Sequence, residues 1–187
     1  SASSWIEQNI LKSTGFVGRI SFTLTLGELP LQDCRKLWGA KAQNISAMEM
    51  LKVLSVTGGI PRYLEEIDPA LSAEDNIKNI CFTRGAFLIN EFNNIFANIF
   101  LRKSDVYKKI VATLTAGSKE FNEICALLET EFSGRVLEYL EELILAGFVK
   151  RDYTWHIITG KDAKLSRYRL SYNYMRFYLK YIEQHLT

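Results

Sequence analysis

The spacing of hydrophobic residues predicts a mainly helical chain. Over most of the sequence, apolar residues recur every three or four positions, which places them on one face of an α-helix. Pro30 suits the first turn of a helix. Ser46, with Glu49 three residues later, forms a capping box, and Ser72 can cap another helix. The helices that we predict are 4–12, 30–38, 46–57, one restarting at Pro61, 72–81, 86–101, 105–116, 119–129, 133–146 and 172–186.

Three other segments have the pattern of β-strands. Residues 19–26, RISFTLTL, alternate apolar and polar positions and are rich in β-branched residues. A strand needs a partner for its backbone groups, and the other strand-like runs, 148–156 and 165–170, lie more than 120 residues later. Segment 19–26 therefore either pairs with those runs or belongs to a sheet outside this chain. We favour the second interpretation.

The order of elements changes after residue 103. Helices 105–116, 119–129 and 133–146 precede the two strand-like runs within about 65 residues, which is the order of a winged helix-turn-helix. We therefore divide the chain into an N-terminal stretch, 1–29, a helical bundle, 30–103, a winged helix, 104–171, and a closing helix, 172–187. The aromatic residues in 86–101 and 172–186 have helical spacing, which favours core packing over ligand stacking.

Composition indicates an ordinary globular protein. The 187 residues are 48% hydrophobic and 24% charged, with a net charge of +2 that is too small to indicate a nucleic-acid or membrane partner. No run approaches the roughly 18 apolar residues of a membrane-spanning helix, and no secretory signal is evident, so we expect no membrane partner and a cytoplasmic location. Cys34, Cys81 and Cys125 form no CxxC pair. We expect buried thiols and no metal site.

Three segments, taken together, resemble one protein family. SASSWIEQNIL followed by GFVGRISFTLTLGELPLQD resembles the stretch after the sensor strand in prokaryotic ATPases of the archaeal-ATPase type, which are relatives of the STAND class of AAA proteins. VTGGIPRYLEEI, at 56–67, resembles the Gly-Gly-x-Pro motif of their helical lid. EYLEELILAGFVKRD with SRYRLSYNYMRFYLKYI resembles their winged helix and the helix after it. The resemblance covers nearly the whole chain.

The resemblance implies that this chain is the C-terminal part of a larger ATPase. Residues 1–29 would be a remnant of the ATPase core, and the start at Ser1, inside a helical pattern, fits a piece of a longer protein. The lid, 30–103, would sense ATP or ADP bound with Mg²⁺ to the missing N-terminal core. The winged helix would pass that state to a partner or to DNA. Assembly as a homo-oligomer stays open.

The chain contains no catalytic motif of its own. It has no GxxxxGK[ST] loop to hold phosphates and no apolar strand ending in paired acids to hold magnesium. In the family these parts lie upstream of the matching region. We therefore expect no ATP hydrolysis, no bound cofactor and no catalytic residue in this chain alone.

By the resemblance, the lid motif is the candidate nucleotide-binding site. Gly58 and Gly59 allow a close backbone approach, and Pro61 sets the start of a helix. In similar ATPases the lid proline lies against adenine. Arg62 would be a cation near phosphate, although an exposed surface arginine fits equally well, and the glycines also fit a helix corner without a ligand. Arg19, in a Gly-Arg pair, would sense phosphate or make a structural ion pair.

The winged helix raises the question of DNA binding. Residues 119–147 carry two basic and seven acidic residues, whereas 150–180 carry eight basic and two acidic ones. Three glutamates of the third helix would meet DNA phosphates unfavourably. Binding through the backbone of DNA would therefore fall to the wing, unless these cations form a solvated face or meet the acidic helices of the same molecule. The candidate DNA-binding residues are Lys150, Arg151, Lys161, Lys164, Arg167 and Arg169.

An alternative function needs no ATPase core. The chain would then be a stand-alone winged-helix DNA-binding transcription regulator, with its first hundred residues forming a dimerisation or ligand-binding bundle. An independent enzyme is a third class, but no nucleophile–base pair or metal cluster supports it.

Overall fold

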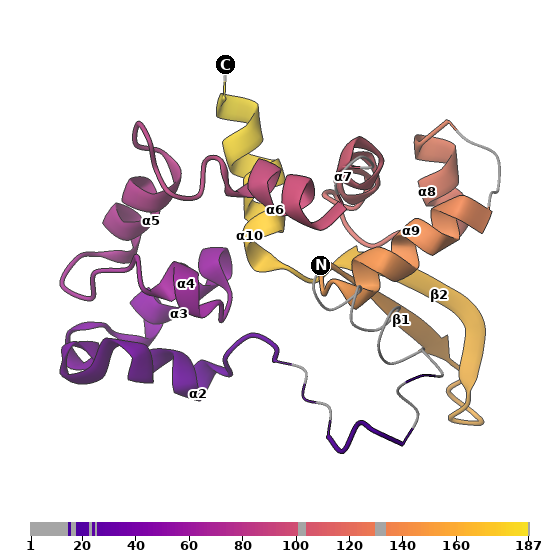
Figure 1. Ribbon diagram of the computed structural model, residues 1–187, viewed down its shortest axis with the longest axis horizontal. Coiled ribbons are helices and arrows are strands. Elements are labelled where there is room, and N and C mark those ends of the chain that lie inside the picture. The colour runs from indigo at the N-terminus through magenta and orange to yellow at the C-terminus, as the bar shows by residue number, and fades with distance from the viewer. Residues whose placement is uncertain are drawn as a thin grey trace. The chain divides into compact units, whose positions relative to one another are not determined.

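A computed structural model describes residues 15, 18–22, 24, 26–100, 104–129 and 134–186 (Figure 1). Within these residues the protein is mainly helical with a small antiparallel sheet, which confirms the predicted class. The elements are α2 (Leu31–Cys34), a 3₁₀ stretch η3 (Arg35–Asn44), α3 (Ala47–Thr57), α4 (Pro61–Leu64), α5 (Ala73–Cys81), α6 (Glu91–Phe100), α7 (Ser104–Thr113), α8 (Phe121–Leu127), α9 (Gly134–Leu145), β1 (Val149–Trp155), β2 (Asp162–Leu170), α10 (Asn173–Phe177), a π-helical stretch η5 (Tyr178–Ile182) and a 3₁₀ turn η6 (Glu183–His185).

The chain divides into two compact units. Residues 93–172 belong to one unit, here called the hairpin unit. Residues 22–92 and 173–186 belong to the other, here called the helical unit. The closing helix therefore folds with residues that come before the hairpin unit in the sequence. No helix within the described residues is long and apolar enough to cross a membrane.

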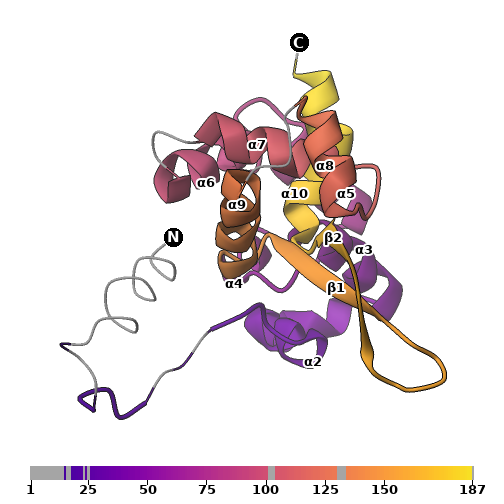
Figure 2. The same cartoon turned by 90° about the vertical axis from the view of Figure 1, so that its right-hand side faces the viewer.

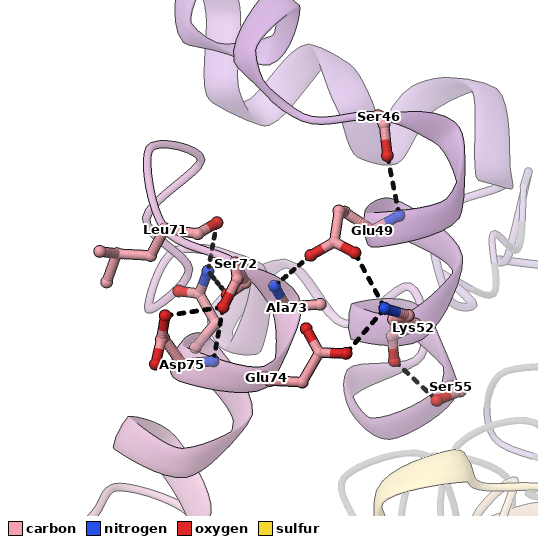
Figure 3. Close-up of polar contacts among 10 residues, drawn as sticks. Ser46, Glu49, Lys52, Ser55, Leu71, Ser72, Ala73, Glu74 and Asp75 are labelled. Carbon is pink, nitrogen blue, oxygen red and sulfur yellow. Dashed lines mark hydrogen bonds and ion pairs between the residues drawn. The ribbon is translucent and has the colours of Figure 1, made fainter.

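Two helices of the helical unit, α3 and α5, start at the predicted serine caps. The Ser46 hydroxyl accepts a hydrogen bond from the Glu49 N–H at 3.2 Å, and Ser72 accepts one from the Asp75 N–H at 3.1 Å. Only half of the predicted capping box forms at α3. The Glu49 carboxylate turns to the start of α5, where it accepts from the Ala73 N–H, and Lys52 pairs with both Glu49 and Glu74 (Figure 3). This polar network ties α3 to α5.

The closing helix supplies much of the core of the helical unit. Tyr174 is buried and donates its hydroxyl hydrogen bond to the Leu88 carbonyl at 2.6 Å. Tyr178 stacks on Phe92 with ring centres 4.3 Å apart. The Asn173 side chain donates to the Leu54 carbonyl at the end of α3. These aromatic residues pack in the core, as their helical spacing predicted.

In the hairpin unit, α7, α8 and α9 precede the antiparallel pair of β1 and β2. The strands pair from Val149 opposite Leu170 to Tyr153 opposite Ser166. Lys119, between α7 and α8, adds an isolated bridge, because its N–H and carbonyl bond to Tyr168 at 2.9 and 2.7 Å. The apolar faces of the helices bury Ile110, Val111, Ile124, Leu140 and Leu143. Figure 2 shows the hairpin extending beyond these helices.

Some predicted elements differ from the structure. The helix expected over 86–101 begins at Glu91, because Gly85 adopts a φ of 76° and residues 84–90 form turns. The helix expected over 30–38 becomes 3₁₀ after Cys34 and has a kink at Gly39.

The predicted strand 19–26 is not a strand at the residues that the structure describes there, namely 19–22, 24 and 26. Strand geometry depends on a bonded neighbour, and none pairs with these residues in the described part of the chain. Phe22, Leu24 and Leu26 are 77%, 67% and 86% exposed. The predicted helix 4–12 lies outside the described residues.

Candidate functional site

The glycine corner, Gly58 to Pro61, joins α3 to α4. Gly58 has a φ of 59°, a left-handed value that glycine adopts without steric cost, and its N–H bonds to the Leu54 carbonyl at 2.9 Å. Ile60 is extended, and Pro61 then occupies the first turn of α4. The predicted sharp restart of the helix is therefore present, and it needs both glycine freedom and the fixed φ of proline.

The chain itself lies against this corner. The Gly59 N–H donates to the Glu28 carboxylate at 3.0 Å, and the Leu29 N–H donates to the Gly59 carbonyl at 2.8 Å. A Cβ built on Gly59 would stand 2.2 Å from the Leu29 carbonyl oxygen. Glu28 and Leu29 thus make the close backbone approach that the glycine pair permits. Sequence reasoning missed this contact, because nothing near Glu28 indicates a partner 31 residues away.

Arg62 lies directly after the corner and pairs locally. Its guanidinium contacts Glu65 at 3.2 Å and Glu66 at 2.6 Å, and it sits 4.7 Å from the centre of the Phe87 ring. Hydrogen bonding to Glu65 raises the pKa of Arg62. The side chain is about half exposed, so a phosphate would have to compete with two carboxylates that directly follow α4.

Arg19 lies in a turn with Gly18, and its side chain is exposed. The sequence placed it at the start of a strand. The described part of 19–26 is not a strand. Sheet pairing therefore does not hold Arg19 in the position that the sequence predicted.

The basic residues of the hairpin fall into two groups. Arg167 contacts Glu120 and Glu123 of the α8 start, both at 3.1 Å, and also donates to the Ser118 carbonyl. Arg169 pairs with Asp152 at 2.6 Å across the strands. Arg167 thus meets an acidic helix of the same molecule, one of the alternatives that the sequence allowed, whereas Arg169 pairs within the hairpin.

The second group has no ion pair within the described residues. Arg151 lies over the rings of Tyr153 and Tyr168 at 4.9 and 5.3 Å, and its Nε donates to the Ser166 hydroxyl. Lys150 and Lys161 are exposed. The side chain of Lys164 lies outside the described residues. Any anion-binding surface of the hairpin therefore centres on Lys150, Arg151 and Lys161.

Helix α9 presents an acidic surface. Glu138 and Glu141 are exposed, while Val136, Leu140 and Leu143 are buried, as the spacing predicted. Glu142 instead accepts a hydrogen bond from the hydroxyl of Tyr107 on α7.

Burial of Tyr107, followed by that bond from its hydroxyl to Glu142, raises the pKa of the tyrosine. Sequence reasoning placed Glu142 outward with the other glutamates and missed this link. Tyr107 and Glu142 are 35 residues apart in the chain, so no local pattern indicates the link.

The described residues provide no metal site. No group of three or more His, Cys, Asp or Glu side chains in this part of the chain could hold an ion. Cys34, Cys81 and Cys125 are buried, as predicted. Burial raises the pKa of the Cys81 thiol to about 12 and also raises that of Cys34, so neither thiol ionises readily.

Comparison with known proteins gives no match: no family model, no curated protein and no solved structure is similar to this chain. The resemblance to archaeal-type ATPases therefore rests on the three sequence segments that carry it.

Proposed function

We propose that this chain is the C-terminal part of an AAA-type ATPase of the archaeal-ATPase type. In this proposal the helical unit is a lid that responds to ATP or ADP held by an ATPase core. The hairpin unit is a winged helix that transmits the nucleotide state to a partner or to DNA. The chain alone contributes to nucleotide sensing and does not hydrolyse ATP.

The exposed apolar segment at 20–26 carries this proposal. Its large side chains alternate as in a strand, yet Phe22, Leu24 and Leu26 are mostly exposed. Exposing this much contiguous apolar surface is unfavourable, so such a run supports a covering partner. In the resembling ATPases, that partner is the sheet of the core.

The position of this segment supports coupling to the lid. Leu26 is two residues from Glu28, and Glu28 and Leu29 bond to Gly59 in the glycine corner. A strand anchored in a core would therefore end next to the turn between α3 and α4. Any shift of that turn with nucleotide state would be transmitted through these two hydrogen bonds, one to the Glu28 carboxylate and one from the Leu29 N–H.

The hairpin unit has features that support a winged helix. It contains the helix order α7, α8, α9 and then the β1–β2 hairpin. The Lys119–Tyr168 bridge extends the sheet by a residue from the segment between the first two helices. The acidic surface of α9 opposes insertion into a DNA groove, which favours a protein partner for this helix.

The first test is the reading frame upstream of Ser1 together with nucleotide binding. We expect that frame to encode a GxxxxGK[ST] loop and the longer protein to bind fluorescent ADP. Substituting Pro61→Ala should weaken that binding by about tenfold, since a hydrophobic contact of this size contributes roughly 1–1.5 kcal/mol. As a control, replacing the lysine of the GxxxxGK[ST] loop should also weaken ADP binding, because that lysine would contact the phosphates in the ATPase core. A native start codon near Ser1 with no ATPase core before it would exclude the proposal.

The stand-alone regulator is the second candidate. The exposed cations Lys150 and Lys161 on the hairpin favour it, because a wing can contact the DNA backbone. A filter-binding titration with duplex DNA at increasing salt tests this role. We expect weak binding that depends on these lysines, and a binding curve unchanged by Lys150→Ala and Lys161→Ala would exclude it.

A further inference from the structure

A row of side chains follows one face of β1 towards the hairpin tip. Successive residues of a strand point to opposite faces, so Arg151 and Tyr153 share a face of β1, and Trp155 follows them beyond an irregularity in the pairing with β2. The guanidinium of Arg151 lies 4.9 Å from the centre of the Tyr153 ring, and the Ser166 hydroxyl holds its Nε at 2.9 Å. Tyr153 and Trp155 are 53% and 61% exposed. The row therefore presents aromatic rings to solvent beside a positioned cation.

The spacing of this row suits flat ligands. Two residues along a strand span roughly 6.6 Å, which leaves room for one planar ring to stack on each aromatic side chain. Arg151 is held by two aromatic rings and a hydroxyl, with no carboxylate among its contacts in the described residues. Its charge is therefore available to an anion near the row.

The hairpin tip continues this surface. Residues 155–159 line a shallow open hollow, and Ile157 and Ile158 are 86% and 98% exposed. The turn is closed by hydrogen bonds from the His156 N–H to the Lys161 carbonyl at 2.9 Å and from the Gly160 N–H to the His156 carbonyl at 2.8 Å. Lys161 at the tip adds exposed positive charge.

We propose that this surface, the aromatic row with the hairpin tip, binds single-stranded nucleic acid. Bases would stack on Tyr153 and Trp155, and Arg151 and Lys161 would contact phosphates. Proteins that bind single strands without sequence preference combine these two elements, aromatic platforms and a positive track. The proposal concerns the hairpin alone and does not depend on the ATPase assignment.

Charge favours a single strand over a duplex. A duplex lying along the hairpin stem would need Arg167 and Arg169, but these are paired with Glu120, Glu123 and Asp152. The bases of a single strand are free to stack on the row. Its phosphates need only the cations beside the row. A lipid surface would engage the Ile157–Ile158 tip, but it would not require rings further along β1.

The test is fluorescence anisotropy of a labelled oligothymidine of about 16 nucleotides, a length that covers a typical single-strand site, titrated with the full chain at low salt. We expect tighter binding to this strand than to a duplex of equal length. Trp155→Ala and Tyr153→Ala should each weaken binding by about tenfold, and Trp155→Phe should retain most of it. Lys161→Ala should reduce the slope of log affinity against log salt by about one.

Phe22→Ala is the matched control, because Phe22 is an exposed aromatic residue outside the hairpin. Thermal melting of each variant verifies that it is folded. The proposal is overturned if the oligothymidine does not bind, if the duplex binds as tightly, or if Trp155→Ala behaves like Phe22→Ala. Binding of the chain to anionic phospholipid vesicles, lost with Ile158→Ser while the oligonucleotide stays unbound, would assign the tip to a membrane instead.

Discussion

Gly59 illustrates how a single residue can be required by its own chain. The Leu29 backbone passes so close to it that no side chain fits, and both its N–H and its carbonyl are bonded to residues 28 and 29. The structure thus gives this glycine a packing role that is independent of any nucleotide. A lid role would add to this requirement and would not replace it.

Gly59→Ala should destabilise the helical unit by about 1–3 kcal/mol, because the new Cβ would overlap backbone atoms that cannot rotate away. Gly27→Ala is the control, since a Cβ at Gly27 meets nothing within 4 Å. Urea unfolding of both variants measures the difference. Equal stability of the two would contradict the close packing of Leu29 on the corner.

Tyr107 is the second residue, and its hydroxyl links two helices of the hairpin unit. It is buried on α7, and its hydroxyl donates to the Glu142 carboxylate on α9. Tyr107→Phe should lower the free energy of unfolding by about 1.5–3 kcal/mol, the range for hydrogen bonds to charged groups. A double-mutant cycle with Glu142→Gln isolates the pair, and a coupling energy near zero would show that the bond contributes nothing.

At the scale of elements, the caps at α3 and α5 are joined through Glu49. Its carboxylate accepts from the Ala73 N–H at the start of α5 and also pairs with Lys52, which reaches Glu74 (Figure 3). A carboxylate at a helix start is favourable because the free N–H groups there carry partial positive charge. This network links the N-terminal half of α3 to the first turn of α5.

The network predicts a specific pH dependence. The hydrogen bond from the Ala73 N–H, followed by that from Lys52, lowers the pKa of Glu49 from its ordinary 4.5, and the Lys52 hydrogen bond lowers that of Glu74. A lowered pKa in the folded state stabilises the fold above pH 4.5, and this contribution is lost as the pH falls further. The melting temperature of the protein should therefore decrease more steeply below pH 4.5 than that of Glu49→Gln. Parallel melting curves for the two proteins would exclude this role.

At the scale of the whole molecule, one of the two units is formed by segments that are not continuous in the sequence. The helical unit is built from 22–92 and 173–186, and the hairpin unit is inserted between these segments. Tyr174, Met175, Tyr178, Leu179 and Ile182 are all buried in the closing segment. The helical unit therefore completes its core only when the C-terminal helix has returned to it.

Truncation after Tyr172 tests this arrangement. Removing the closing segment should expose the core of 47–92 and increase amide hydrogen exchange there, because partners of Phe92 and Leu88 are lost. Exchange in 104–170 should change little. Hydrogen exchange read by mass spectrometry separates the two segments. Unchanged protection of 47–92 would show that this segment is stable without the closing helix.

Some features followed from the sequence by itself, because their signals are local. Ser46 and Ser72 start helices since a hydroxyl reaches an N–H three residues away, and the buried face of α9 follows from a period of 3.6 residues. The mainly helical class and the β-hairpin depend on the same short-range patterns. The acidic surface of α9 was also evident, since burying Leu140 turns Glu138 and Glu141 outward.

Only the tertiary structure decided the partners of polar and backbone groups that are far apart in the chain. Glu49 caps α5 rather than its own helix, Leu29 lies on Gly59, and Arg167 pairs with the start of α8. The pattern of 19–26 is that of a strand, yet the described residues there form none, because a strand exists only when another chain segment bonds to it. Local sequence determines which groups need a partner. It does not determine which partner they find, because the packing of the whole core decides which distant residues come close together.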